Sequence, residues 1–165
     1  MKESYFSNDI LDFFYLLYRY NVKYMVVGGE AVIFYGHARL TGDIDFYYER
    51  SKKNIDSLYK ALKDFWNNDI PGIESKKELL KEGMVFQFGV PPNRIDLINS
   101  IEDISFSEAW ENRFGSMIKY KRTKIDIYYL GLDDLIKNKK AVRRYKDKED
   151  LKFLIKARHK LKNEK

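Results

Sequence analysis

The 165-residue sequence contains no cysteine and only two histidines, His37 and His159. The lack of cysteine excludes disulfide bonds and thiolate metal sites, and two histidines are too few for a histidine-rich zinc centre. Hard oxygen ligands therefore remain for metal binding. Long apolar runs are also lacking, because acidic residues interrupt the apolar N-terminal stretch, so no segment reaches membrane-spanning length. We expect a soluble, cytoplasmic protein with no membrane partner.

Positive charge is concentrated near the C-terminus. The net charge is +6, but residues 135–165 alone hold thirteen Lys and Arg against four Asp and Glu, which leaves 18 bases against 21 acids in the first 134 residues. This division favours a metal at the carboxylates and a phosphate-rich ligand at the bases. From the length and the 44% hydrophobic content we expect one domain over residues 1–165, with a basic helical segment from about residue 131.

Apolar spacing and turn residues predict an alternation of helices and strands. The predicted helices cover residues 8–20, 30–36, 51–68 and most of the chain beyond Gly131. Two predicted strands begin at residues 24 and 43, and two further pairs of strands are predicted within 84–98 and 117–130. This order predicts an α+β or mixed α/β fold, in which helices flank a small mixed or antiparallel sheet.

Two glycines and three aspartates are the first candidates for a site. Gly28 and Gly29 lie between an apolar strand and a helix, where free N–H groups attract an anion and no side chain blocks a phosphate. Asp43 and Asp45 alternate along a predicted strand, so their carboxylates share a face, with Cα atoms about 6.5 Å apart. Positive charge is needed between anions that close. Asp96 is able to approach from a neighbouring strand.

Three carboxylates beside a phosphate are the ligand set of a two-metal site for phosphoryl or nucleotidyl transfer. The three aspartates are therefore the candidate catalytic and metal-binding residues, with Mg²⁺ or Mn²⁺ as cofactor and an NTP as substrate. Lys139, Arg143 and Lys146 recur at helical spacing in the basic segment, so we expect them to share one helix face. That face either neutralises the triphosphate or is a solvated charged surface.

The stretch GGEAVIFYGHARLTGDIDFYY, from Gly28 to Tyr48, resembles the polymerase-beta-type nucleotidyltransferase superfamily. With LIKNKKAVRRYKDKEDL near the C-terminus, it is similar to the small bacterial branch related to AbiEii-type nucleotidyltransferase toxins. The resemblance implies a nucleotidyltransferase fold in which Asp43 and Asp45 ligate Mg²⁺. It implies that Asp96 is the third carboxylate and helps to deprotonate an acceptor hydroxyl, and that the two glycines face the nucleotide phosphates.

The loop between the glycines and the aspartates carries further candidates. Arg39 and Thr41 match the polar approach of the family motif, and Arg39 either braces the carboxylates, contacts a phosphate or pairs with a nearby acid. His37 is either a structural loop residue or a substrate contact. Glu30 departs from the family pattern, because many members have serine there, and an acid repels a triphosphate unless it points away.

The leading prediction is a Mg²⁺-dependent enzyme that moves an NMP from an NTP to a hydroxyl of RNA such as tRNA, of a protein or of a small molecule. Membership of the toxin branch would imply an antitoxin partner. The alternative is a catalytically silent nucleotide- or RNA-binding module of the same fold that acts through a protein partner. A third interpretation is nucleic-acid binding by the basic segment alone, in which the aspartates are irrelevant.

Overall fold

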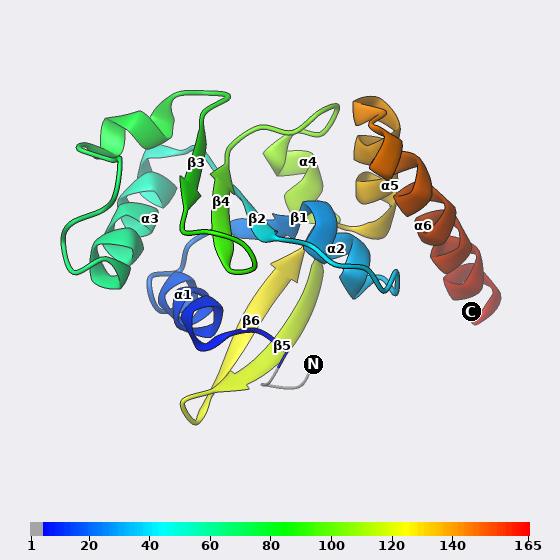
Figure 1. Ribbon diagram of the computed structural model, residues 1–165, viewed down its shortest axis with the longest axis horizontal. Coiled ribbons are helices and arrows are strands. Elements are labelled where there is room, and N and C mark those ends of the chain that lie inside the picture. The colour runs from blue at the N-terminus through cyan, green and yellow to red at the C-terminus, as the bar shows by residue number, and fades with distance from the viewer. Residues whose placement is uncertain (1–4) are drawn as a thin grey trace.

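The computed structural model describes residues 5–165, which form a six-stranded mixed sheet flanked by six α-helices (Figure 1). Across the sheet the strands are β3 (Val85–Phe88), β4 (Arg94–Ile98), β2 (Asp43–Tyr48), β1 (Tyr24–Val27), β6 (Thr123–Tyr129) and β5 (Phe114–Tyr120). The β2–β4 and β1–β6 pairs are parallel, and the other three pairs are antiparallel. The predicted α+β class is confirmed.

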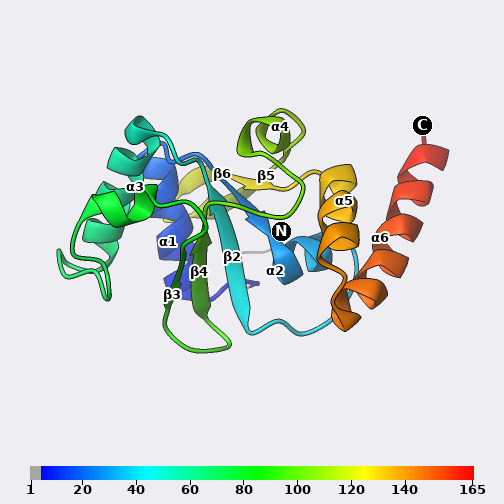
Figure 2. The same ribbon diagram turned by 90° about the horizontal axis from the view of Figure 1, so that it is seen from above.

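The helices lie on both sides of the central strand β2. They are α1 (Asn8–Arg19), α2 (Gly28–Phe34), α3 (Lys52–Phe65), α4 (Phe106–Glu111), α5 (Leu132–Val142) and α6 (Tyr145–Asn163), with a 3₁₀ helix η1 at Lys76–Leu80. In both views α1 and α3 lie to one side of β2, and α5 and α6 to the other (Figures 1 and 2). Within residues 5–165, no helix combines the length and apolarity that crossing a bilayer requires.

Aromatic packing holds α1 against β2. The hydroxyl of Ser7 accepts a hydrogen bond from the Ile10 N–H, so α1 begins where a capping residue precedes an apolar pattern. Phe13 and Phe14 of α1 meet Phe46 of β2 edge to face, with ring centroids 5.0 and 5.4 Å apart. This contact fixes the strand that begins with the two predicted metal ligands.

The structure differs from the predicted helices in the start of one helix and in one helix that was not predicted. The helix expected from Glu30 begins at Gly28, because the chain turns into the helix directly after Val27. The helix α4 was not predicted, although Ser105 caps it by accepting a hydrogen bond from the Glu108 N–H. Six residues are too few to show an apolar period, so spacing alone does not reveal such an element.

The single helix face expected for Lys139, Arg143 and Lys146 is wrong. The helix α5 ends at Val142, Arg143 adopts a left-handed conformation with φ +59°, and α6 starts at Tyr145. Neither glycine nor proline marks this break. The signal lies in Asp147, whose carboxylate accepts from the N–H of Arg144 and so caps the start of a new helix.

Strand register places the predicted site at one end of β2. In the parallel pair, Asp45 lies opposite Asp96 and Asp43 lies opposite Arg94. In the antiparallel pair on the other edge of β2, Val27 lies opposite Asp45. The diglycine bend therefore follows β1 at the level of the acidic residues, next to them in space although it precedes them by some fifteen positions in the sequence.

Candidate active site

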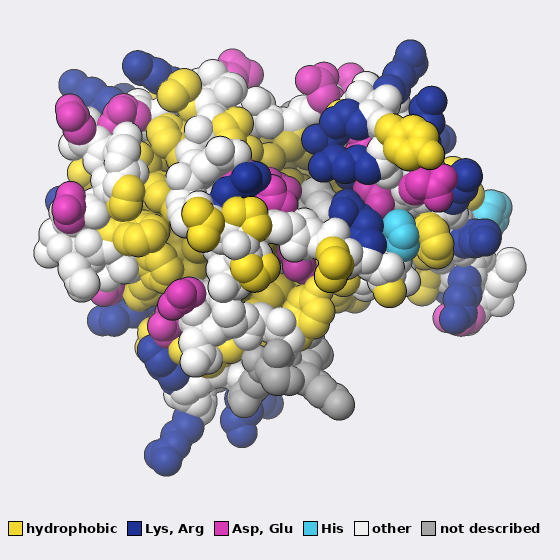
Figure 3. Space-filling view, viewed as in Figure 1, with side chains coloured by type: hydrophobic (Ala, Val, Ile, Leu, Met, Phe, Trp, Pro, Cys, Tyr) yellow, Lys and Arg dark blue, Asp and Glu magenta, His cyan; other side chains and the backbone are white. Residues whose placement is uncertain are grey.

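The structure brings Asp43, Asp45 and Asp96 together on one face of the sheet, and we refer to them as the carboxylate cluster. One oxygen of each side chain lies within 4.8 Å of one oxygen of each of the others. Asp96 is buried, and the two residues of β2 are half-buried. The cluster opens into a cleft of about 490 Å³ whose lining includes Gly28, Gly29 and residues of α5. Acidic and basic side chains adjoin on this face of the molecule (Figure 3).

Arg94 supplies positive charge within the carboxylate cluster, and it was not among the residues predicted from the sequence. One terminal nitrogen of its guanidinium donates to Asp43 at 2.6 Å and to Asp96 at 3.0 Å, and Nε donates to the other Asp96 oxygen at 2.9 Å. Such bidentate arginine–carboxylate pairs combine charge with fixed geometry. The signal was present, because Arg94 lies two residues before Asp96 and therefore on the same strand face.

Asp45, the remaining carboxylate of the cluster, has no arginine or lysine paired with it among the contacts of the described residues. Burial, followed by the negative charges of Asp43 and Asp96, raises the pKa of Asp45 from 3.8 to about 7, although Lys139 and Arg94 act in the opposite direction. The cluster is therefore short of positive charge at Asp45. Three carboxylates are the oxygen donors that Mg²⁺ and Mn²⁺ prefer, so the residues fit a divalent cation at this position.

The diglycine bend lets the chain approach the acids closely. Gly28 has φ +64°, and a Cβ atom there would overlap the Asp45 carboxylate. A Cβ atom at Gly29 would lie 2.8 Å from the Thr41 hydroxyl and 3.0 Å from the Arg39 guanidinium. Both positions require glycine for reasons of space, and the first also for its backbone conformation.

The loop before β2 connects the carboxylate cluster to the C-terminal helix. The hydroxyl of Thr41 donates to the Asp43 carboxylate at 3.1 Å. Arg39 lines the cleft, but its partner is Asp150 of α6, to which it donates at 3.2 Å. His37 lies 3.2 Å from the same carboxylate, and its ring stacks on Phe153 at 3.8 Å. Three roles were predicted for Arg39, and its contact with Asp150 corresponds to the third, pairing with a nearby acid.

The predicted basic residues occupy different places. Lys139 and Lys146 line the cleft from α5 and α6, and Arg144 joins them. Arg143 is exposed and is not among the lining residues, because its left-handed backbone ends α5, and its Nε donates to the carbonyl of Lys140. Lys and Arg side chains gather on the α5–α6 side of the molecule (Figure 3).

Glu30 points away from the carboxylate cluster. Its carboxylate accepts a hydrogen bond from the Tyr5 hydroxyl at 3.1 Å, and it lines a separate pocket with Phe34. Burial is the largest cause that raises its pKa above the ordinary value. The acid that departs from the family pattern therefore does not face a phosphate bound at the diglycine bend.

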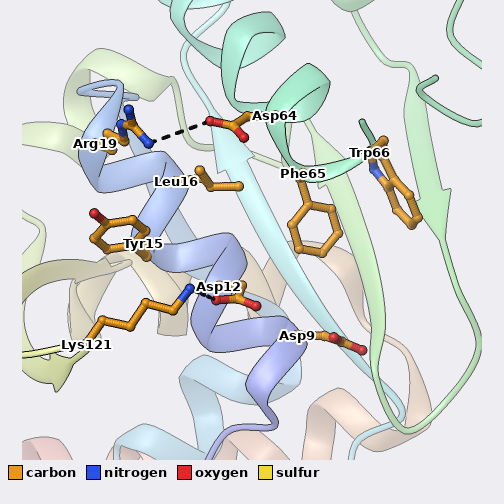
Figure 4. Close-up of a pocket in the computed structure, with 9 residues that line it drawn as sticks. All are labelled: Asp9, Asp12, Tyr15, Leu16, Arg19, Asp64, Phe65, Trp66 and Lys121. Atoms are coloured by element: carbon orange, nitrogen blue, oxygen red, sulfur yellow. Dashed lines mark ion pairs between the residues drawn. The ribbon is translucent and has the colours of Figure 1, made fainter. Parts of the chain in front are cut away.

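A second cavity, of about 470 Å³, lies between α1, the end of α3 and the β5–β6 turn, and shares no residue with the cleft (Figure 4). Two ion pairs, Arg19 with Asp64 and Lys121 with Asp12, account for four of its five charged side chains. These charges already neutralise one another across the cavity. Asp9 alone among these five has no ion pair, whereas the carboxylate cluster gathers three acids around Arg94.

Residues 10–156 match the model of a family described as "Nucleotidyltransferase of unknown function (DUF6036)". No curated protein matches the sequence.

Proposed function

Because the chain belongs to this family of nucleotidyltransferases of unknown function, we propose that it transfers a nucleoside monophosphate from an NTP to a hydroxyl group in a Mg²⁺-dependent reaction. The observation that carries the proposal is the convergence of Asp43, Asp45 and Asp96 beside the diglycine bend. In the transfer, the acceptor oxygen bonds to the α-phosphorus, the bond to the β-phosphate oxygen breaks, and pyrophosphate leaves.

The carboxylate cluster holds the metal in this proposal. When bound, Mg²⁺ supplies charge stabilisation for the attacking and leaving oxygens. Asp96 takes the proton of the acceptor hydroxyl, for which Arg94 has to release one of the two Asp96 oxygens that it contacts. The chain's own residues otherwise act by placing the reactants and by electrostatics, as in other phosphoryl transfers.

The triphosphate lies along the wall formed by the diglycine bend and the bases of the cleft. Gly28 and Gly29 leave room for phosphate oxygens, and Lys139, Lys146 and Arg39 line the same cleft. The orientation of Glu30 toward Tyr5 supports this placement, because it removes the acid that would repel the triphosphate. Arg143, which lies outside the lining, has no part in it.

An RNA such as tRNA is the acceptor that the charge distribution favours. The exposed lysines of α6 include Lys148, Lys152 and Lys156, and phosphate contacts by such residues bind nucleic acid without regard to sequence. Proteins and small molecules are the other acceptor classes. A toxin role, with an antitoxin as protein partner, is proposed from the AbiEii resemblance alone.

The test is incubation of the purified protein with each labelled NTP, Mg²⁺ and a cell extract. We expect label to enter RNA, and entry into protein or small molecules would instead identify those acceptors. Asp43→Asn and Asp45→Asn should abolish labelling, whereas Asp69→Asn, at an exposed position outside the cleft, should not. No labelling with any of the four NTPs would contradict the proposal.

The silent binding module is the second candidate, and the occupation of two cluster carboxylates by Arg94 favours it. In that case the Asp43→Asn and Asp45→Asn proteins bind RNA as the unsubstituted protein does, and neither form transfers label. If the basic segment alone bound nucleic acid, Lys152→Glu with Lys156→Glu would abolish binding. These exposed positions suit the test better than a truncation, because α6 also carries the buried residues Asp147 and Asp150.

A further inference from the structure

We infer that Asp150 is a positioning residue, which holds Arg39 and Lys139 at the wall of the cleft where the phosphates of a nucleotide bind. The inference rests on the proposed function for the identity of the ligand. Through Asp150, α6 then supports the nucleotide site, a role that differs from contact with an acceptor.

The Asp150 side chain is 1% exposed and lies among nitrogen atoms of three residues, His37, Arg39 and Lys139. Its Oδ2 accepts from a terminal nitrogen of Arg39 at 3.2 Å and lies 3.2 Å from Nζ of Lys139. Its Oδ1 lies 3.0 Å from Nε of Arg39 and 3.2 Å from Nδ1 of His37, although neither contact has the alignment of a hydrogen bond. One carboxylate thus joins the loop before β2, α5 and α6.

The two bases that Asp150 contacts face the proposed phosphate site. Arg39 lies against the diglycine bend, since its guanidinium would touch a Cβ atom at Gly29. Lys139 is near enough to the carboxylate cluster to lower the pKa of Asp45. Both bases line the cleft. A buried carboxylate behind them fixes their side chains, which then need not be ordered when a phosphate binds.

The neighbouring carboxylate, Asp147, completes the support of Lys139. It is fully buried and accepts from Nζ of Lys139 at 2.8 Å and from Nε of Arg144 at 3.0 Å. Apart from these two acids, Leu154 is the one fully buried residue of α6. The helix is therefore attached to the body of the protein in part through groups that hold cleft-lining bases.

The alternative role for Asp150 is simple neutralisation of Arg39 and Lys139, and the two roles predict opposite results. A counter-charge competes with phosphate, so its removal frees two cations and tightens anion binding. A positioning residue prearranges the cations, so its removal weakens anion binding, by about tenfold or more if one charge-assisted hydrogen bond to the ligand is lost. The sign of the change therefore distinguishes them.

The experiment is calorimetric titration of the full-length protein with inorganic tripolyphosphate and, separately, with Mn²⁺. We expect Asp150→Asn to weaken tripolyphosphate binding at least about tenfold and to leave Mn²⁺ affinity within about twofold. Glu149→Gln, at the exposed adjacent position where Glu149 pairs with Lys152, should change neither. If transfer is measurable, the KM for NTP should rise more than kcat falls.

Unchanged or tighter tripolyphosphate binding by Asp150→Asn would overturn the inference, and so would an equal loss of Mn²⁺ affinity, which would indicate a merely structural role. If Asp150→Asn does not fold, Arg39→Gln decides, because Arg39 is 22% exposed, and unchanged tripolyphosphate binding by that variant overturns the inference too. The binding assay needs no turnover. A protein that transfers no label but binds tripolyphosphate through Asp150 would contradict the proposed function alone.

Discussion

Replacing Gly28 by alanine tests whether the diglycine bend and the carboxylate cluster form one unit. The residue has φ +64°, a conformation that costs an alanine roughly 1–2 kcal/mol. The added methyl group overlaps the Asp45 carboxylate, so that side chain has to leave its rotamer at a cost of about 1 kcal/mol. We expect a loss of about 2–3 kcal/mol in the free energy of unfolding, measured by urea denaturation.

The displaced Asp45 should also bind metal poorly. Disturbing the groups that orient a ligand typically weakens metal binding by roughly 10–100-fold, which a Mn²⁺ titration by calorimetry resolves. Gly72→Ala is the matched control, because Gly72 has φ +73° but no heavy atom near its Cβ position, so only the backbone cost applies. If Gly28→Ala matched Gly72→Ala in stability and kept its Mn²⁺ affinity, the reasoning that joins the bend to Asp45 would be refuted.

Three further predictions concern charge and hydrogen bonding. Arg94→Gln should lower the melting temperature without metal but increase the stabilisation by Mn²⁺ in thermal scans, because the guanidinium both neutralises and competes for two cluster carboxylates. Asn54→Ala should cost roughly 2–4 kcal/mol in urea denaturation, since the buried Asn54 side chain satisfies backbone groups of Lys23 and Glu49. The pKa of Asp147 lies below its ordinary 3.8, because hydrogen bonds from two bases outweigh the effect of burial. Its contribution to stability is therefore present above pH 3.8 and lost as the pH falls through the lowered pKa. Asp147→Asn should reduce the free energy of unfolding at neutral pH and flatten the acid limb of its pH dependence.

Each of these three predictions has an outcome that would contradict it. Mn²⁺ stabilisation of Arg94→Gln that equals or falls below that of the unsubstituted protein would show that the guanidinium does not compete with metal. An Asn54→Ala cost within about 0.5 kcal/mol, the range of ordinary surface substitutions, would mean that water replaces the lost hydrogen bonds. An unchanged acid limb for Asp147→Asn would assign acid unfolding to other carboxylates.

The sequence predicted the elements and residues that depend on local spacing. Alternation placed Asp43 and Asp45 on one strand face, and the apolar flanks of Asp96 identified its strand. Their meeting required that two segments some fifty residues apart pair in parallel with Asp45 opposite Asp96. No single-segment pattern contains that register, although the family resemblance implied that Asp96 joins the other two acids.

What the sequence did not predict depends on tertiary contacts between charged residues. Arg94 shares a strand face with Asp96, but its contact with Asp43 depends on the pairing of two strands. The shared face expected for Lys139, Arg143 and Lys146 was wrong because helical spacing continues across Arg143, whereas buried contacts of Asp147 and Asp150 hold the second helix in a new direction. Buried acids in a segment rich in lysine look like surface residues until their partners are known.

The two short strands β2 and β4 carry both the acids of the carboxylate cluster and residues of the hydrophobic core. Ile44, Ile95 and Leu97 alternate with the acids and are buried in the core. A slip of one residue between the strands would exchange the faces, exposing the aliphatic side chains and sending Asp96 into the apolar interior. Misregistered chains are thus penalised by the hydrophobic effect before any metal is encountered, and changes in the surrounding loops and helices are free to alter specificity while the acids keep their alignment.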